Sequence, residues 1–313
     1  MIGTSVKDSI AVEAGPLPGA KGSATLSFLL SRLKSSQKAK LKALYSRSKR
    51  LFIEQFRSYG SRELESCLRD LGVTSGDTVM LHSAFASSGF RGSPKDLVDV
   101  FLRSIGPNGN LLMVSLPYSS STYEYLQKLK TFDVRKTPSH MGMISESFRR
   151  REGVLRSFHP THPVLAIGPK AEWIIADHDK CLVPCGPGSP FEKVTQLGGK
   201  VVFFNVPFPT ITLFHYLEHL VERTLPFPLY LGEAFEVRSI DSTGKISMIE
   251  TRVFSPEAVR RRRPLILMEE LDKQRLIRRS RVGNSRVMCV AAMDAIASTE
   301  QMARAGKLFY DLT

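Results

Sequence analysis

Residues 77–118, DTVMLHSAFASSGFRGSPKDLVDVFLRSIGPNGNLLMVSLPY, contain the pattern that indicates the fold class. It opens with an apolar run that predicts a buried strand, and the end of this strand carries His82 and Ser83. Ser93-Pro94-Lys95-Asp96 predicts a helix start, because Ser is a favoured N-cap, Pro suits the first turn and an acid follows three residues after the cap. GNLLMVSLPY at 109–118 predicts the next strand. A strand, a helix and a second strand in this order are typical of an α/β layer fold.

The same alternation continues along the chain. ELESCLRDLG predicts a helix that ends at Gly72, and SPFEKVTQLGG predicts another that begins at Ser189 and ends at two glycines. KVVFFNV predicts a buried strand, and TLFHYLEHLVER at 212–223 predicts a helix. EAFEVRSIDSTGKISMIETRVF predicts a β-hairpin that turns at 241–244. We therefore expect one catalytic α/β domain over residues 59–313.

Residues 1–58 differ in character from this domain. The first 23 residues are rich in Gly, Ala, Ser and Pro, which predicts a flexible tail. From 26 to 56, apolar residues at helical spacing are interleaved with Lys and Arg, which predicts a basic amphipathic helical extension. The longest apolar runs fall short of the roughly 20 residues that cross a bilayer, and the start lacks the pattern of a secretory signal. We expect a cytoplasmic protein, which the basic helix could hold peripherally at the inner face of a membrane.

The formal net charge of +14 is unevenly distributed. Residues 21–57 hold ten basic side chains and one acid, Glu54. Further arginines cluster at 260–263 and at 275–281. Such clusters attract phosphates, anionic polymers or acidic lipid surfaces, and the alternative is a solvated basic face without a partner. Nucleic acid is not the expected partner, because the chain has no recognised binding motif and its aromatics do not interleave with the basic run.

The cysteines do not indicate a zinc site. The chain has four, and only Cys181 and Cys185 lie close together in sequence. No second pair completes a set of metal ligands. We interpret all four as reduced thiols that fill apolar space.

The histidines gather in the centre of the chain. Four of the seven lie in HPTHP at 159–163 and in HYLEH at 215–219, and His178 sits between these motifs. On a helix, one turn separates the first histidine of HYLEH from its glutamate, so an imidazole and a carboxylate can meet. A carboxylate against an imidazole fixes the tautomer, as a group that orients a general base does. The candidate catalytic residues are His162, Glu218, His159, His178 and His215, and a hydrogen-bonded structural role is the alternative for each histidine taken alone.

HYLEH also matches the inverted zinc-protease pattern H-x-x-E-H. A zinc hydrolase through His215, Glu218 and His219 is therefore a rival hypothesis from another class. Two imidazoles on one helix need a third ligand, and nothing downstream of Arg223 supplies an obvious one. We expect no bound metal.

The segment FDVRKTPSHMG at 132–142 predicts a turn ahead of a helix that runs through Ser147 and Phe148. Ser139 can cap that helix, and Gly142 removes bulk where another molecule could approach. A helix N-terminus flanked by Arg135 and Lys136 would suit a pyrophosphate. Most capped helices bind nothing, so this pattern alone is a weak indication.

Several motifs together resemble the antibiotic, or aminoglycoside 3-N-, acetyltransferase family. Their order is LGVTSGDTVMLHSAFASSGF, then FDVRKTPSHMGMISESFRRREGVLRSFHPTHPVLAIGP, then GPGSPFEKVTQLGGKVVFFNV, then TLFHYLEH. The resemblance extends from about residue 60 to 310.

The resemblance implies a three-layer α/β/α fold, acetyl-CoA as the donor and direct transfer of acetyl to an amine without an acyl-enzyme. It also implies that His162, His159 and Glu218 face the acceptor and that backbone N–H groups near Ser83 hold the developing oxyanion. It leaves a homodimer open. The residues that would line the CoA groove are His82, Ser83, Ser87, Thr137, Ser139, Met141 and Gly142.

The chain departs from the family pattern at three places. The basic extension before residue 60 is an addition. HSAFASSGF stands where the family more often has a serine-rich HSSLSSLGW. Val183-Pro184-Cys185 stands where some members have a histidine shortly before GPGSP, so we expect His162 to act as the base, with His178 as the weaker candidate.

The charge bears on the acceptor. Aminoglycosides are polycations, and a chain of net charge +14 is a poor match for them. An amino sugar on a nucleotide carrier, a lipid-linked glycan or an anionic polysaccharide precursor is the expected acceptor. An aminoglycoside resistance enzyme and an O-acetyltransferase acting on a glycan stay open as alternatives, because a general base serves either nucleophile.

Overall fold

The computed structural model describes residues 35–312. The predicted tail and the start of the predicted basic helix lie outside these residues. The chain divides into two compact units, Met1–Phe52 and Ile53–Thr313. Helix α2 (Ser35–Phe56) confirms a helix over the later part of the basic segment. No helix within the described residues is long and apolar enough to cross a membrane. Peripheral binding to a membrane stays a prediction.

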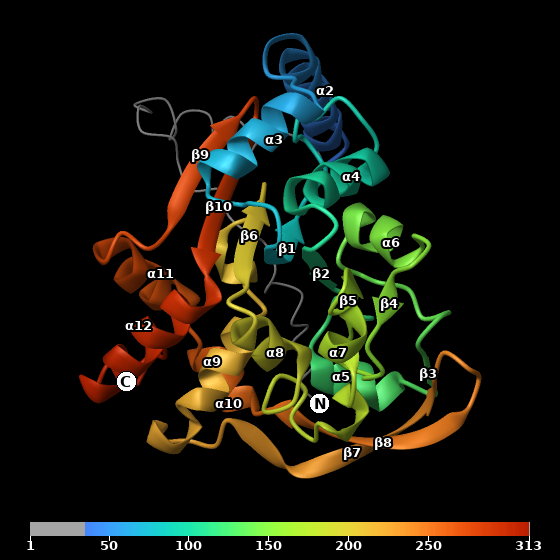
Figure 1. Ribbon diagram of the computed structural model, residues 1–313, viewed down its shortest axis with the longest axis vertical. Helices are drawn as coiled ribbons and strands as arrows, with labels where there is room; N and C mark the ends of the chain where they lie inside the picture. Colours follow the sequence, from blue (N-terminus) through green and yellow to red (C-terminus); the bar gives the residue numbers. More distant parts are fainter. Residues whose placement is uncertain (1–34, 313) are drawn as a thin grey trace. The chain divides into compact units, whose positions relative to one another are not determined.

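The second unit is built on a seven-stranded sheet in the order β4-β5-β2-β1-β6-β10-β9 (Figure 1). The central strand β1 pairs in parallel with β2 and β6, and the outer strands pair antiparallel. The strands are β1 (Thr78–Ser83), β2 (Asn110–Val114), β4 (Leu155–Arg156), β5 (Val164–Ile167), β6 (Lys200–Phe204), β9 (Arg278–Val282) and β10 (Ser285–Ala291).

Helices cover both faces of this sheet. Successive side chains of a strand point to opposite faces, so Val79 and Leu81 join one hydrophobic cluster and Met80 joins the other. The first cluster includes side chains of α3 (Ser61–Asp70), α4 (Pro94–Ile105) and α6 (Met143–Arg149). The second includes side chains of α7 (Ala171–Ile175), α8 (Pro190–Gln196), α9 (Phe214–Leu220), α10 (Pro256–Arg261), α11 (Pro264–Lys273) and α12 (Ala292–Arg304). The predicted three-layer α/β/α fold is confirmed, and burial on both faces explains the near-continuous apolar strands.

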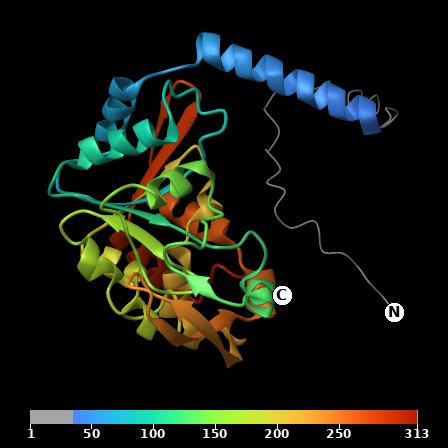
Figure 2. The same cartoon turned by 90° about the vertical axis from the view of Figure 1, so that its right-hand side faces the viewer.

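A smaller sheet packs with its own core. It has three strands in the order β3-β7-β8, namely β3 (Phe132–Asp133), β7 (Tyr230–Ile240) and β8 (Ile246–Phe254). The long antiparallel pair confirms the predicted hairpin. Helix α5 (Thr122–Lys128) contributes Leu126 to the cluster with Phe132, Val237 and Val253. Figures 1 and 2 place this sheet at the opposite end of the unit from α3 and α4.

The parallel strands define one edge that matters for function. The carboxyl ends of β1, β2 and β6 lie at the same edge because these strands run the same way. The antiparallel strand β5 begins at this edge, so the HPTHP motif just before it lies there too. The segment after β6 leads through a short 3-10 turn, η2 (Phe208–Thr210), into α9. Such edges are where open α/β sheets bind ligands.

Two of the three predicted caps are confirmed. The Ser93 hydroxyl accepts from Asp96 N at 3.2 Å, and the Asp96 carboxylate accepts from Ser93 N at 2.7 Å. The Ser189 hydroxyl caps α8 by accepting from Glu192 N, and the Glu192 carboxylate accepts from Gly188 N over 2.7 Å. The cap predicted at Ser139 is wrong, because α6 begins after Gly142 and Ser139 donates its N–H to the Glu146 carboxylate at 3.0 Å. The Ser139 hydroxyl lies 3.0 Å from the Ser145 hydroxyl and accepts from Met141 N over 3.3 Å.

The backbone at Gly168 gives a test of the packing at the end of β5. Gly168 has φ of 130°, and a Cβ there would lie 2.3 Å from the carbonyl oxygen of Gly109. Gly168→Ala should lower the free energy of unfolding by about 1–3 kcal/mol, since the strained backbone and the clash both disfavour a side chain. Gly232→Ala is the control, because no atom lies within 4 Å of a Cβ at that position. Chemical denaturation would contradict the prediction if both variants were equally stable.

Candidate active site

The centre of the site is an imidazole–carboxylate pair on α9. His215 donates its Nδ1–H to Glu218 Oε2 over 2.8 Å, three residues along the helix. The apolar side chains of α9 enter the core, and the His215 side chain stays 20% exposed. With the proton on Nδ1, the lone pair is on Nε2. The pair that the HYLEH spacing predicts is therefore formed.

Two more donors converge on the same carboxylate. Arg262 Nε donates to Glu218 Oε1 over 2.6 Å, and the Tyr310 hydroxyl donates to the same oxygen. The Glu218 side chain is fully buried. Burial alone would raise the pKa of Glu218, but Arg262 and the hydrogen bond from His215 hold it below its usual range. Glu218 is thus an ionised carboxylate without contact with solvent.

His162 lies beside this pair. Its ring stands nearly perpendicular to that of His215, with the centroids 5.8 Å apart, and Phe254 contacts both rings. His162 Nδ1 lies 3.0 Å from the Thr161 hydroxyl, and Nε2 lies 3.5 Å from the Tyr118 hydroxyl. Burial, followed by the repulsion of His215, lowers the pKa of His162 well below its usual value. Burial and Arg262 lower the pKa of His215 as well, so both rings are neutral at pH 7.

His159 and His178 form a stacked pair behind this centre, with ring centroids 4.6 Å apart. Both are fully buried. His178 Nε2 donates to the Pro184 carbonyl and its Nδ1 accepts from the Ser157 hydroxyl, each over 2.7 Å. His159 Nε2 donates to the Cys181 carbonyl over 3.3 Å, and its Nδ1 accepts from Thr161 N. Both nitrogens of each ring are engaged, which matches the structural alternative considered for these two histidines.

The predicted CoA residues of β1 lie at the strand end. His82 is buried and stacks on Phe203, and its Nε2 accepts from Thr212 N over 3.5 Å, just before α9. Burial lowers the pKa of His82 to about 4. Ser83 is half-buried and Ser87 is exposed. The N–H of Ala84 donates to the Phe204 carbonyl over 3.0 Å, so this group, next to Ser83, is not free for an oxyanion.

The predicted CoA turn sits beside the end of β2. His140 N donates to the Leu116 carbonyl over 2.8 Å, which ties the turn to the segment that leads to Tyr118. Thr137 is used within the turn, where its hydroxyl accepts from Asp133 N over 2.9 Å. Met141 is half-buried, while Gly142 has φ of 94° and open space around it. A surface hollow lies here, lined by Ser139, His140, Gly142, Met143, Glu146, Ser147 and Arg150.

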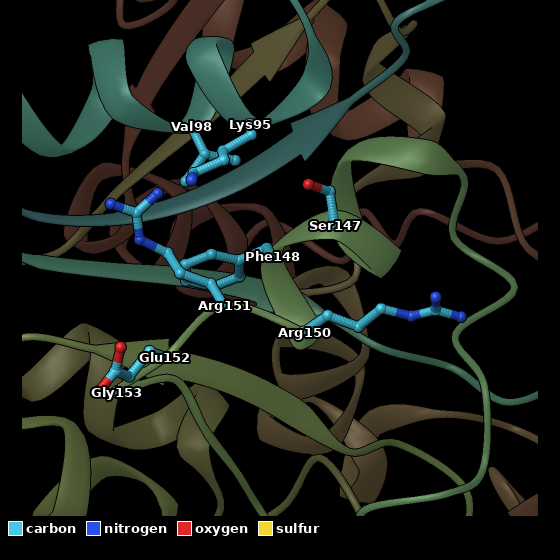
Figure 3. Close-up of a pocket in the computed structure, with 8 residues that line it drawn as sticks. All are labelled: Lys95, Val98, Ser147, Phe148, Arg150, Arg151, Glu152 and Gly153. Atoms are coloured by element: carbon cyan, nitrogen blue, oxygen red, sulfur yellow. The ribbon is translucent and has the colours of Figure 1, made fainter.

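A second hollow adjoins the first, because the two share Ser147 and Arg150. Figure 3 shows Lys95 and Val98 of α4 on one side and Ser147 of α6 on the other, with Arg150 and Arg151 pointing in different directions. Arg151 forms an ion pair with Asp99 over 2.6 Å. Arg150 pairs with Glu146 over 2.8 Å, and Glu152 also lines the second hollow. A groove with charges of both signs therefore follows α6.

The comparisons with known proteins agree with this geometry. A family model described as aminoglycoside 3-N-acetyltransferase matches residues 80–304. The chain belongs to this family. The solved structure of aminoglycoside acetyltransferase AAC(3)-Xa superposes with a TM-score of 0.71 at 24% identity, over 81% of this chain and 95% of that one. AAC-IIIb in a binary complex with CoASH gives a TM-score of 0.67 at 25% identity, over 80% of this chain and 97% of that one.

Curated relatives from the same family match over a shorter part. Aminoglycoside N(3)-acetyltransferase VII of Streptomyces paromomycinus is 29% identical over 171 residues, which are 50% of this chain and 58% of that protein. Aminoglycoside N(3)-acetyltransferase IV of a Salmonella species is 35% identical over 159 residues, or 50% of this chain and 57% of that protein. The aligned parts are less than two thirds of these relatives.

Sequence reasoning missed several members of the site. Arg262 and Tyr310 are far from α9 in sequence, and Tyr118 and Phe254 carry no motif. The arginine run at 260–263, interpreted as an attractor of anions, is largely engaged within the protein: Arg262 pairs with Glu218, and Arg263 pairs with Asp311 over 3.1 Å. For the groove along α6, the triple arginine at 149–151 was a signal that could have been used.

The zinc-protease-like pattern resolves into two separate pairs. His215 contacts Glu218, whereas His219 Nδ1 lies 3.2 Å from Glu222 Oε2. Within residues 35–312, no three His, Cys, Asp or Glu side chains come together in a way that could hold a metal ion. All four cysteines are buried, which agrees with the interpretation that they fill apolar space.

The buried histidines predict acid sensitivity. Burial lowers the pKa of His178 to about 3, whereas in an unfolded chain a histidine has a pKa of about 6.5. Below pH 6.5 the unfolded chain therefore binds a proton at this histidine, whereas the folded protein does not. As the pH is lowered, the free energy of unfolding falls by about 1.4 kcal/mol per pH unit for each such ring. In His178→Gln, the free energy of unfolding should fall less steeply than in the wild type as the pH is lowered from 6 to 5, because one such ring is absent. Guanidinium unfolding at several pH values measures it, with exposed His140→Gln as the control. An unchanged pH slope in His178→Gln would contradict the prediction.

Proposed function

We propose that this protein is an acetyl-CoA-dependent N-acetyltransferase that acetylates an amino group of an amino sugar. The observation that carries the proposal is the His215–Glu218 pair, with its Nε2 lone pair at the strand edge of a member of the acetyltransferase family. The neighbour AAC-IIIb, whose structure contains CoASH, supports the same donor here.

The chemistry follows from the protonation states. An acceptor ammonium has no lone pair, so His215 Nε2 first takes one of its protons. The freed amine then attacks the thioester carbonyl carbon, a C–N bond forms, and the C–S bond breaks to release CoA thiolate. The proton on His215 passes to that sulfur. The nitrogen that attacked then gives its second proton to the freed Nε2 of His215, which passes it to water, so that a neutral amide and CoA thiol are left. Glu218 stays ionised throughout and stabilises the imidazolium. We propose His215 as the base in place of His162, which was expected from the sequence, because the Glu218 carboxylate accepts from His215. Neutral His162 and the Tyr118 hydroxyl line the same centre.

The predicted CoA residues suggest where the donor lies. The turn at 137–142 connects through Leu116 to the segment that contacts His162. The groove along α6 begins at this turn and adds Lys95, whose charge suits the phosphates of CoA, and Arg150, which pairs with Glu146 and is 71% exposed. We place the thioester end near His82 and Ser83, and the phosphates along α6.

An aminoglycoside is the acceptor class that fits best. The net charge of the whole chain argued against a polycationic acceptor. After residue 57, however, the chain has 33 basic and 27 acidic side chains, a net charge of only +6. The other +8 of the net charge lies in residues 1–57. AAC-VIa, another structural neighbour, was solved with sisomicin bound. An anionic amino sugar is the second candidate, favoured by the basic segment at 21–57. Homodimer formation stays a prediction.

Acetyl transfer by the purified protein tests the proposal. With acetyl-CoA we expect thiol release that depends on kanamycin, and His215→Ala should lower kcat/KM by about 10²- to 10⁴-fold because the general base is lost. His219→Ala, one turn further along α9, is the matched control and should retain most of the activity.

The acceptor is decided in the same assay. UDP-linked amino sugars are compared with kanamycin at equal concentration. Turnover of the UDP-linked sugars alone would favour the anionic acceptor. No turnover of any amine, or full activity in His215→Ala, would overturn the proposed function.

The groove along α6 gives a separate prediction for the donor. Combining Lys95→Glu with Arg150→Glu should raise KM for acetyl-CoA about 5-fold or more at low salt, because two charges facing the phosphates are reversed. The KM for the acceptor should change little. Arg304→Glu, an exposed arginine of α12, is the control for a general loss of positive charge. Equal KM values for acetyl-CoA in the variant and the wild type would show that the phosphates lie elsewhere.

A further inference from the structure

We propose that Arg262 and Tyr310 are positioning residues that keep Nε2 of His215 as the proton-accepting nitrogen, and that the C-terminal segment 309–311 is therefore part of the active site. The proposal rests on the proposed function for its consequence in catalysis. The family match ends at residue 304, before Tyr310.

The two carboxylate oxygens of Glu218 accept hydrogen bonds from different donors. Oε1 accepts from Arg262 and Tyr310, and Oε2 accepts from His215. Because the side chain is fully buried, no solvent is available to replace a missing donor. Arg262 Nε thus supplies the compensating charge and Tyr310 a neutral donor.

Backbone contacts fix the positions of Arg262 and Tyr310 relative to each other. Arg262 and Tyr310 face each other in an antiparallel bridge. Arg263 N donates to the Phe309 carbonyl over 2.8 Å, and Asp311 N donates to the Arg261 carbonyl over 2.7 Å. Phe309 packs on Phe214 of α9, with ring centroids 4.5 Å apart. The C-terminal segment is therefore fastened to the end of α10 and to α9, the helix that carries His215.

The tautomer of His215 depends on the charge of Glu218. An ionised carboxylate can only accept, so Nδ1 carries the proton and Nε2 keeps its lone pair. Without Arg262, burial would favour the protonated carboxyl, which would donate to Nδ1. The neutral ring would then hold its proton on Nε2 and could not take one from an ammonium.

Other titratable groups near the pair do not replace Arg262. His162 faces the pair from the HPTHP segment, and Cys185 and Tyr230 face it from the loop before α8 and from β7. Burial raises the pKa of Cys185 and of Tyr230 above their usual values, so both are neutral at pH 7. Arg262 also lies over the Phe254 ring, 4.7 Å from its centroid, which holds the guanidinium in place.

The test is the pH dependence of kcat/KM for acetyl transfer. Arg262→Met removes a positive charge, so the His215–Glu218 pair takes up a proton more readily. The acid limb of the profile, where kcat/KM falls as the pH is lowered, should therefore move to higher pH by about 1–3 pH units. Tyr310→Phe should move it in the same direction by less. Arg262→Lys keeps the charge and should keep the limb close to that of the wild type. A loss of packing alone would lower the rate at every pH without moving the limb.

Matched controls separate the site from general damage. Arg279→Met removes an arginine that pairs with Asp272 instead of Glu218. Tyr59→Phe removes a buried hydroxyl that donates to Ser285 over 2.8 Å, away from Glu218. Neither control should shift the acid limb. If Arg262→Met does not fold, Tyr310→Phe alone decides the question.

A second measurement does not need activity. Nitrogen-15 NMR of the imidazoles reports which nitrogen of His215 is protonated in the free protein. The wild type should show Nδ1–H, and Arg262→Met should show Nε2–H or the doubly protonated ring at pH 7. Folded variants with an unchanged tautomer and an unchanged acid limb would overturn the positioning role. If Arg262→Met changes the tautomer of His215 but the wild type transfers no acetyl, the positioning role stands and the proposed function is overturned.

Discussion

The site depends on one buried negative charge, the carboxylate of Glu218. An ionised carboxylate removed from water loses several kcal/mol of solvation unless donors replace the water. Here the donors come from three parts of the chain: His215 from the same helix, Arg262 from the end of α10 and Tyr310 from the C-terminal segment. The charge is stable only when these parts are folded together. The site therefore forms only when α9, the end of α10 and the C-terminal segment are all in place.

The sheet explains why the remaining groups gather around this charge. β1, β2 and β6 run parallel, so their carboxyl ends share an edge, and β5 runs the other way and begins there. His82 at the end of β1 contacts the backbone just before α9, and His162 ahead of β5 contacts the ring of His215. Helix α9 and the HPTHP segment are more than fifty residues apart in sequence, yet the topology brings them into contact.

Local patterns predicted much of this architecture. The cap at Ser93, the hairpin turning after β7 and the pair between His215 and Glu218 depend on residues only a few positions apart, so their spacing contains the information. The cap at Ser139 failed because α6 begins after Gly142 and not after Ser139. His159 and His178 were predicted to be catalytic from their residue type. Their rings instead form hydrogen bonds with the main-chain carbonyls of Cys181 and Pro184. A local sequence pattern does not identify such partners.

By itself, the sequence determined the α/β class, the family and the imidazole–carboxylate pair, because strand periodicity, motif order and helix spacing are properties of contiguous residues. Only the tertiary structure decided that the arginines at 260–263 are largely engaged in ion pairs, that Arg262 and Tyr310 hold Glu218, and that His159 and His178 are enclosed. The physical reason is that the charge state of a buried group depends on every neighbour within a few ångströms, and most of those neighbours are distant in the chain.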